Sequence, residues 1–325
     1  MPCLPHPSER ELVAHMSISK RIDRITHLSH EYSGLRLPAP KTVKIELTAN
    51  CNYKCGFCVK SLRPDNGEMD RGFFSQIIRD MRGCGVEEIG LFYIGESFLC
   101  PWLPEAIAEC KAVGFPYVFL TTNGSASNPE KVEACMKAGL DSLKFSLNFA
   151  SPQQLKEVAN VTERFWGKAI ENLKAAKKIR DEGGYSTKIY ASSIKFDGKQ
   201  GELMQQLVDE IKPYVDEHYW LPLYGMSGAS VNIGWKPKPG NPGRLDAMVP
   251  PLPCWAVFTE GHVTHDGKLV ACCFGSGIDG DLVMGDLMKD DFMTAWNSKA
   301  YQRLREAHLN EDVRETPCAS CAAGS

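Results

Sequence analysis

Three cysteines lie close together in the segment Cys51-Asn52-Tyr53-Lys54-Cys55-Gly56-Phe57-Cys58, directly after the apolar run 43–47. Their C-x3-C-x2-C spacing lets thiolates of one short loop bind a single iron–sulfur cluster. A [4Fe–4S] cluster takes four ligands, so this loop leaves one iron open, as catalytic zinc sites leave one position open. A zinc loop or three unrelated thiols are the alternatives, which the position after a strand-like run disfavours.

A second group of cysteines lies near the C-terminal end: Cys254, Cys272, Cys273, Cys318 and Cys321. The Asp266-Gly267 pair predicts a β-hairpin between Cys254 and Cys272. A helix is expected at about 292–308, before the final C-x2-C pair. A hairpin that brings two thiols near this pair completes a four-thiolate site, for a cluster or for a zinc ion.

The first loop resembles the signature of the radical S-adenosylmethionine (radical SAM) enzymes, including the aromatic Phe57 before the third cysteine. The resemblance implies that Cys51, Cys55 and Cys58 hold a [4Fe–4S] cluster whose open iron binds S-adenosylmethionine. The reduced cluster then cleaves this cofactor to a 5′-deoxyadenosyl radical, which abstracts a hydrogen atom from the substrate. An external one-electron donor, similar to flavodoxin or ferredoxin, is expected as a partner.

The C-terminal part resembles the auxiliary-cluster domains of the same enzymes, in the short twitch form rather than the longer SPASM form. This resemblance implies a second [4Fe–4S] cluster with the ligands Cys254, Cys272, Cys318 and Cys321. Cys273 is then left over beside a ligand. It is either a hydrogen-atom donor to a substrate radical or a buried neighbour, which strand alternation would turn away from Cys272.

Strands and helices alternate through the first two thirds of the chain. Apolar runs predict strands at 43–48, 88–93, 117–122, 142–147, 187–195 and 217–221. Amphipathic segments predict helices at 71–83, 102–113, 129–138, 164–181 and 200–212. This βαβ pattern predicts an α/β fold, a partial (β/α)6 TIM-like barrel, with a small twitch-type domain of a hairpin and a helix after it. The active site is expected at the C-terminal ends of the strands.

Polar residues follow these strands where the cofactor is expected. Gly95-Glu96 resembles the family's Gly-Gly-Glu motif, although Ile94 replaces the first glycine. Glu96 offers the acceptor that the methionine ammonium group needs. The fifth strand, with Ser192, Ser193 and Lys195, is expected to add substrate or cofactor contacts. The cofactor contacts expected from the resemblance and the strand ends are Phe57, Gly95, Glu96, Asn123, Ser146 and Asn148.

The expected domain organisation has four parts. Residues 1–40 form an N-terminal extension that caps the barrel, and residues 41–221 form the radical SAM barrel. Residues 222–253, rich in glycine and proline, are expected as a linker over the barrel mouth. Residues 254–325 form the auxiliary-cluster domain.

Composition excludes several classes of function. The 325 residues are 43% hydrophobic and 24% charged, which is ordinary for a globular protein. A net charge of −3 gives no reason to expect nucleic acid as a partner. No apolar run is long enough for a membrane span, and no secretory signal is visible. The thirteen cysteines gather at metal-ligand spacings, which favours a reducing cytoplasm.

Four functions remain open on this basis. The favoured one is an oxidoreductase that oxidises a substrate radical through the auxiliary cluster, a dehydrogenase of a small polar substrate such as a sugar or aminocyclitol. The second is an epimerase with Cys273 as hydrogen donor. The third is a peptide-modifying maturase. The fourth is a non-catalytic iron–sulfur redox relay, in which a fourth thiolate near the first loop would be needed to bind the open iron.

Overall fold

The structure is a computed structural model that describes residues 16–63, 66–196, 198–221, 252–273, 275 and 282–320. The expected cluster ligand Cys321 lies outside these residues, as does the expected linker except for its last two positions. Within them, no helix is both long enough and apolar enough to cross a membrane.

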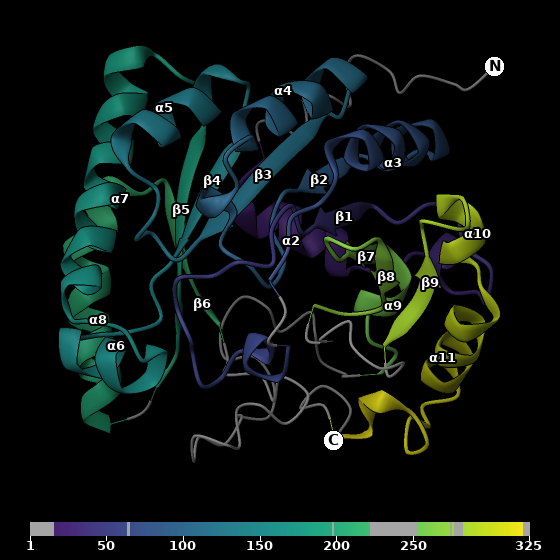
Figure 1. Ribbon diagram of the computed structural model, residues 1–325. Helices are drawn as coiled ribbons and strands as arrows, with labels where there is room; N and C mark the ends of the chain where they lie inside the picture. The colour runs from purple at the N-terminus through teal and green to yellow at the C-terminus, as the bar shows by residue number, and fades with distance from the viewer. Residues whose placement is uncertain are drawn as a thin grey trace.

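The described strands form one sheet, ordered β6-β5-β4-β3-β2-β1-β7-β8-β9 (Figure 1). The first six are β1 (Thr42–Ile45), β2 (Glu88–Gly90), β3 (Tyr117–Thr122), β4 (Ser142–Ser146), β5 (Lys188–Ile194) and β6 (Glu217–Leu221). Neighbours among these six pair in parallel. A parallel sheet with helical crossovers confirms the predicted partial barrel.

Helices cover the outer side of this sheet (Figure 1). They are α3 (Arg71–Cys84), α4 (Leu103–Val113), α5 (Pro129–Lys137), α6 (Pro152–Ala159), α7 (Arg164–Gly183) and α8 (Gly198–Ile211). Asp70 caps the start of α3 through the Phe73 amide, and Gly85 ends it in the left-handed conformation that glycine tolerates best. The sequence predicted these helices except α6, a short segment between β4 and α7.

Side-chain alternation along the strands separates two environments. On β1, Val43 and Ile45 are fully buried in the hydrophobic core beneath the helices, whereas Lys44 faces a cavity inside the sheet. On β4, Leu143 belongs to the core and Lys144 to the cavity. The inner face of the barrel therefore carries the polar groups that can meet a ligand.

Helix α2 (Ile18–Thr26) closes the end of the barrel where the strands begin. Nε of Arg21 lies 2.7 Å from Oε2 of Glu88, the first residue of β2. Arg24 adds ion pairs to Glu87 at 2.5 Å and to Glu88 at 2.6 Å. This part of the N-terminal extension is thus anchored to the barrel through buried charges.

The C-terminal part continues the barrel sheet. Its elements are α9 (Ala256–Thr259), β7 (Glu260–Val263), β8 (Lys268–Val270), β9 (Val283–Asp286), α10 (Phe292–Trp296) and α11 (Lys299–Leu309). Strand β7 pairs in parallel with β1, and β7, β8 and β9 then pair antiparallel. The single helix expected at about 292–308 is two helices, because Ser298 caps a new start at α11. The sequence also missed β9.

Candidate active site

The loop of Cys51, Cys55 and Cys58 lies over α6. The amide of Lys54 donates to the carbonyl of Ala159 at 2.9 Å, and the amide of Gly56 to that of Val158 at 2.8 Å. The cysteines pack against an apolar cluster of Tyr53, Phe57, Phe149, Leu155, Ala159 and Ile194. The unpredicted helix α6 therefore supplies the C-terminal backbone carbonyls that hold the loop.

These three thiols are partly buried and near one another. Burial raises the pKa of Cys51 to about 12, with a contribution from the charges of Glu96 and Cys58. Burial and the two other thiols raise the pKa of Cys55 well above its usual value, and burial raises that of Cys58. Thiols in such a place ionise only beside a compensating positive charge, which bound iron provides. The donor set therefore fits an iron–sulfur cluster.

The Gly95-Glu96 motif rests on the chain just before the cluster loop. The Glu96 amide donates to the Asn50 carbonyl at 2.8 Å. A Cβ atom on residue 95 would lie 1.9 Å from the carbonyl oxygen of Thr48, so only glycine permits this approach. The Glu96 carboxylate accepts from Thr122 Oγ1 at 2.7 Å and from the Asn123 amide at 2.8 Å. Burial raises the pKa of Glu96, although these hydrogen bonds oppose it.

Three other predicted contacts lie at neighbouring strand ends. Asn123 donates through Nδ2 to Oδ1 of Asn52 at 3.0 Å, within the cluster loop. Asn123 and Ser146 line one small pocket with the ring of Tyr53. Oδ1 of Asn148 is buried without a hydrogen-bond partner among the described residues, so it can accept a hydrogen bond from a ligand. The structure thus gathers these residues, while their contacts to a cofactor stay predictions.

A cavity of about 370 Å³ lies between the inner faces of the strands and α2. Its wall includes Lys44, Lys144 and Tyr219 from the barrel, together with Cys254 and Cys272 from the C-terminal part. Two expected ligands of the auxiliary cluster therefore border the same cavity as the barrel strands.

His308 of α11 joins two of the expected auxiliary ligands. Its Nδ1 accepts the Cys254 amide hydrogen bond at 3.1 Å, and its Nε2 lies 3.4 Å from Sγ of Cys318. The Tyr93 hydroxyl donates to the Cys272 carbonyl at 3.2 Å. His308 thus links the backbone of Cys254 to the thiol of Cys318, while the four-thiolate cluster with Cys272 and Cys321 stays a prediction. The sequence around His308 contained no pattern that predicts its contacts with Cys254 and Cys318.

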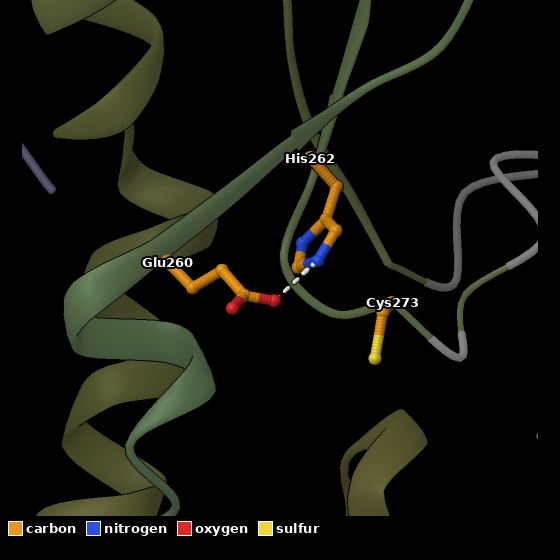
Figure 2. A group of neighbouring side chains, drawn as sticks. All are labelled: Glu260, His262 and Cys273. Atoms are coloured by element: carbon orange, nitrogen blue, oxygen red, sulfur yellow. Dashed lines mark ion pairs between the residues drawn. The ribbon is translucent and has the colours of Figure 1, made fainter. Parts of the chain in front are cut away.

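Figure 2 shows a buried group that the sequence did not reveal, made of Glu260, His262 and Cys273. Nε2 of His262 lies 2.6 Å from Oε1 of Glu260, and Lys44 Nζ donates to the same oxygen at 2.6 Å. The three potential ligand atoms lie within 4.8 Å of one another. Cys273 follows β8 instead of continuing it, so strand alternation does not turn it away, and it lines the cavity with Cys272.

Charges within this group compensate one another. Burial would raise the pKa of Glu260, but the positive charges of Lys44 and His262 outweigh burial and lower it to about 2. Burial would lower the pKa of His262, but the charge of Glu260 raises it above its ordinary value. Lys44, Glu260 and His262 therefore form a charged network beside the cavity.

Comparisons with known proteins match both cysteine regions. The model of the radical SAM superfamily matches residues 45–189, and that of the SPASM iron–sulfur cluster-binding domain matches residues 254–322. A GTP 3′,8-cyclase of Chlorobaculum tepidum is 31% identical over 141 residues, which are 42% of each chain. A PqqA peptide cyclase of Methylorubrum populi is 30% identical over 39% of this chain and 37% of its own. The matches thus span about two fifths of these relatives.

Solved structures share the fold at low identity. Streptococcus suis SuiB bound to its precursor peptide SuiA has a TM-score of 0.66 at 16% identity, over 89% of this chain and 71% of its own. BtrN in complex with AdoMet and 2-DOIA has a TM-score of 0.55 at 15% identity, over 86% and 92%. The cofactors that follow from the two matched domains are S-adenosylmethionine and two iron–sulfur clusters. The chain belongs to the radical SAM superfamily and carries a C-terminal SPASM-type iron–sulfur domain.

Proposed function

We propose that this protein is a radical SAM oxidoreductase that dehydrogenates a small polar substrate, of sugar-like size, in the barrel cavity. The observation that carries the proposal is that Cys254 and Cys272 line the same cavity as Lys44 and Tyr219. An auxiliary cluster on these cysteines would border the substrate. An external one-electron donor, similar to flavodoxin or ferredoxin, belongs to the same proposal.

Dehydrogenation removes one hydrogen atom, one proton and one electron from the substrate. S-adenosylmethionine, when bound, would supply the radical that takes the hydrogen atom, and the auxiliary cluster would accept the electron. Helix α2 closes the far end of the cavity, which limits the access of water to a reactive substrate. The substrate would then lie beside the auxiliary-cluster cysteines Cys254 and Cys272.

The released proton needs an acceptor. Glu260 lines the cavity, and its carboxylate lies between Lys44 and His262. The Glu260 carboxylate, whose pKa is lowered to about 2, is too weak a base to hold this proton near neutral pH. We therefore propose that the proton passes to solvent, while the charged network of Lys44, Glu260 and His262 positions the substrate.

A second candidate is epimerisation, which the position of Cys273 in the cavity wall favours. A thiol there could return a hydrogen atom to the substrate radical from the opposite face. SuiB binds a precursor peptide and another relative is a peptide cyclase, so peptide modification is a third candidate. The cavity volume of about 370 Å³ would then take one side chain.

The test uses the full chain, reconstituted anaerobically, with S-adenosylmethionine, dithionite and a metabolite extract as the source of substrates. We expect 5′-deoxyadenosine to form together with a product that has lost two hydrogen atoms. A product that is an isomer of the substrate, and that gains one deuterium when the reaction runs in heavy water, would instead support epimerisation. Fully loaded, reduced protein that never cleaves S-adenosylmethionine would support the relay function.

A further inference from the structure

The cavity wall contains three positively charged side chains, Arg21, Lys44 and Lys144. Two of them have carboxylate partners. Arg21 pairs with Glu88 at 2.7 Å, and Lys44 pairs with Glu260 at 2.6 Å. Lys144 has no carboxylate within ion-pair distance among the residues that the structure describes. One positive charge of the cavity is therefore left without a counter-charge there.

Lys144 is held inside the cavity by the geometry of β4. Strand alternation places its neighbours Leu143 and Phe145 in the hydrophobic core, so Lys144 points to the opposite face. Its Nζ lies 5.7 Å from the centroid of the Tyr219 ring. Tyr190 and Phe119 line the same cavity. A partly buried ammonium group surrounded by rings gains most from an anionic ligand, because little water is present to screen the charge.

A hydroxyl group provides a second, independent observation. Oγ1 of Thr42 is buried and has no hydrogen-bond partner among the described residues. Thr42 is 2% exposed and lines the same cavity. Buried hydroxyl groups in folded proteins almost always have a partner, so a ligand oxygen or nitrogen is the natural one here.

We propose that Lys144 binds an oxyanion of the substrate, a carboxylate or a phosphate, while the aromatic wall holds the substrate's apolar or ring-shaped body. This inference rests on the proposed function in one respect, namely that the cavity holds the substrate. An ammonium group next to Lys144 would be repelled. The inference therefore narrows the substrate from polar molecules in general to anionic ones and disfavours an aminocyclitol.

Two fluorescent probes of nearly the same shape test this charge preference. 8-Anilinonaphthalene-1-sulfonate carries an oxyanion, and N-phenyl-1-naphthylamine lacks it. The quantity that decides is the ratio of their affinities for the reconstituted full chain. We expect Lys144→Gln to lower this ratio about tenfold, because a charge-assisted contact is lost. Lys144→Arg should keep the ratio within about twofold, since its charge is retained.

Lys174→Met is the matched control. Lys174 lies 5.3 Å from the ring centroid of Tyr214, a contact similar to that of Lys144, but it belongs to α7 and pairs with Glu210 at 2.9 Å. We expect its ratio to equal that of the wild type. Equal affinity ratios of the two probes in Lys144→Gln and Lys144→Arg would overturn the anion site. The same conclusion would follow if Lys174→Met lowered the affinity ratio as much as Lys144→Gln does.

Competition separates the two oxyanions. Phenylacetate should displace the sulfonate probe if the substrate carries a carboxylate, and phenyl phosphate should do so if it carries a phosphate. Displacement by neither compound would overturn the proposal. Neither probe is oxidised, so failure of the anion site would leave the proposed dehydrogenation untouched. Absence of dehydrogenation would equally leave the binding result standing.

Discussion

Nδ1 of His265 lies 3.2 Å from Oε2 of Glu46, so the hairpin turn of the C-terminal domain contacts the residue that follows β1. Arg63, just beyond the first cluster loop, binds the same carboxylate oxygen and lies 3.0 Å from the same His265 nitrogen. The His265 ring also packs against Gly67. A Cβ atom on residue 67 would lie only 2.4 Å from Nε2 of this ring, so a side chain there would displace it. One buried carboxylate thus joins the segment after the first cluster loop to the hairpin turn between Cys254 and Cys272.

Replacing Glu46 by alanine should destabilise the protein strongly. The change removes the buried carboxylate that both Arg63, whose side chain is 3% exposed, and His265 contact. We expect the free energy of unfolding to fall by about 3–5 kcal/mol. Arg79→Met is the control, because Arg79 is 62% exposed in its pair with Glu109 and should lose at most ~1 kcal/mol. Thermal unfolding measures the stability of both variants. Equal melting temperatures of Glu46→Ala and Arg79→Met would contradict the prediction.

Iron content tests the two cluster sites. Two [4Fe–4S] clusters give about eight iron atoms per chain. Replacing Cys51, Cys55 and Cys58 together with alanine should halve the iron, as should removal of Cys254 and Cys272. Cys110→Ala should leave the iron unchanged, because Cys110 is fully buried in the core. Zinc in place of iron at the C-terminal site would refute the second cluster.

Glu96→Gln should weaken the binding of S-adenosylmethionine about tenfold, because the ammonium group of the cofactor loses a charged acceptor. The amide keeps the size of the side chain, so the fold should persist. Equilibrium dialysis with labelled cofactor measures the affinity of the reconstituted protein. Glu105→Gln on α4 serves as the control, with unchanged affinity expected. An unaltered affinity in Glu96→Gln would remove Glu96 from the predicted cofactor contacts.

Cys273→Ala separates the two proposed reactions. In a dehydrogenase the electron leaves through the auxiliary cluster, so the variant should form product at a rate within a few-fold of the wild type. In an epimerase the variant should still release 5′-deoxyadenosine but lose the inverted product. Product analysis after one turnover in heavy water decides, since a thiol hydrogen exchanges with solvent. Deuterium at the attacked carbon without net oxidation would reverse our preference.

His218 should make the protein sensitive to acid. Burial lowers its pKa from 6.5 to about 4, and its Nε2 lies 3.1 Å from Oγ of Ser193. Between these values the unfolded state binds more protons than the folded state, so the free energy of unfolding falls as the pH falls from 6.5 towards 4. After allowance for partial exposure, we expect a loss of about 1–2 kcal/mol. His218→Gln should lose less between pH 7 and pH 5 in thermal unfolding; an identical loss would disprove this origin.

Local patterns made much of the fold predictable. Strand β3 has the bounds predicted for it, Tyr117–Thr122, and α3 follows an Asp cap and precedes a glycine. The cysteine spacing predicted both metal regions, because ligands of one loop must be close in sequence. These features depend on residues a few positions apart, where the sequence carries direct information.

Long-range pairing could not be predicted in this way. The group of Glu260, His262 and Cys273 exists only because β7 lies beside β1, which brings Lys44 next to Glu260. Neither residue suggests the other in the sequence. The same holds for Arg21 of α2, which is 5% exposed and pairs with Glu88 of β2.

The position of β1 between β2 and β7 also constrains the order of assembly. Residues 260–263 leave the ribosome long after β1, so during synthesis β1 first has a partner on one side only. An apolar strand with an open edge can pair with other chains. Closure of that edge joins residues more than two hundred positions apart, a contact of the kind that slows folding. A nascent barrel of this type would therefore be most prone to aggregation just before its last third is translated.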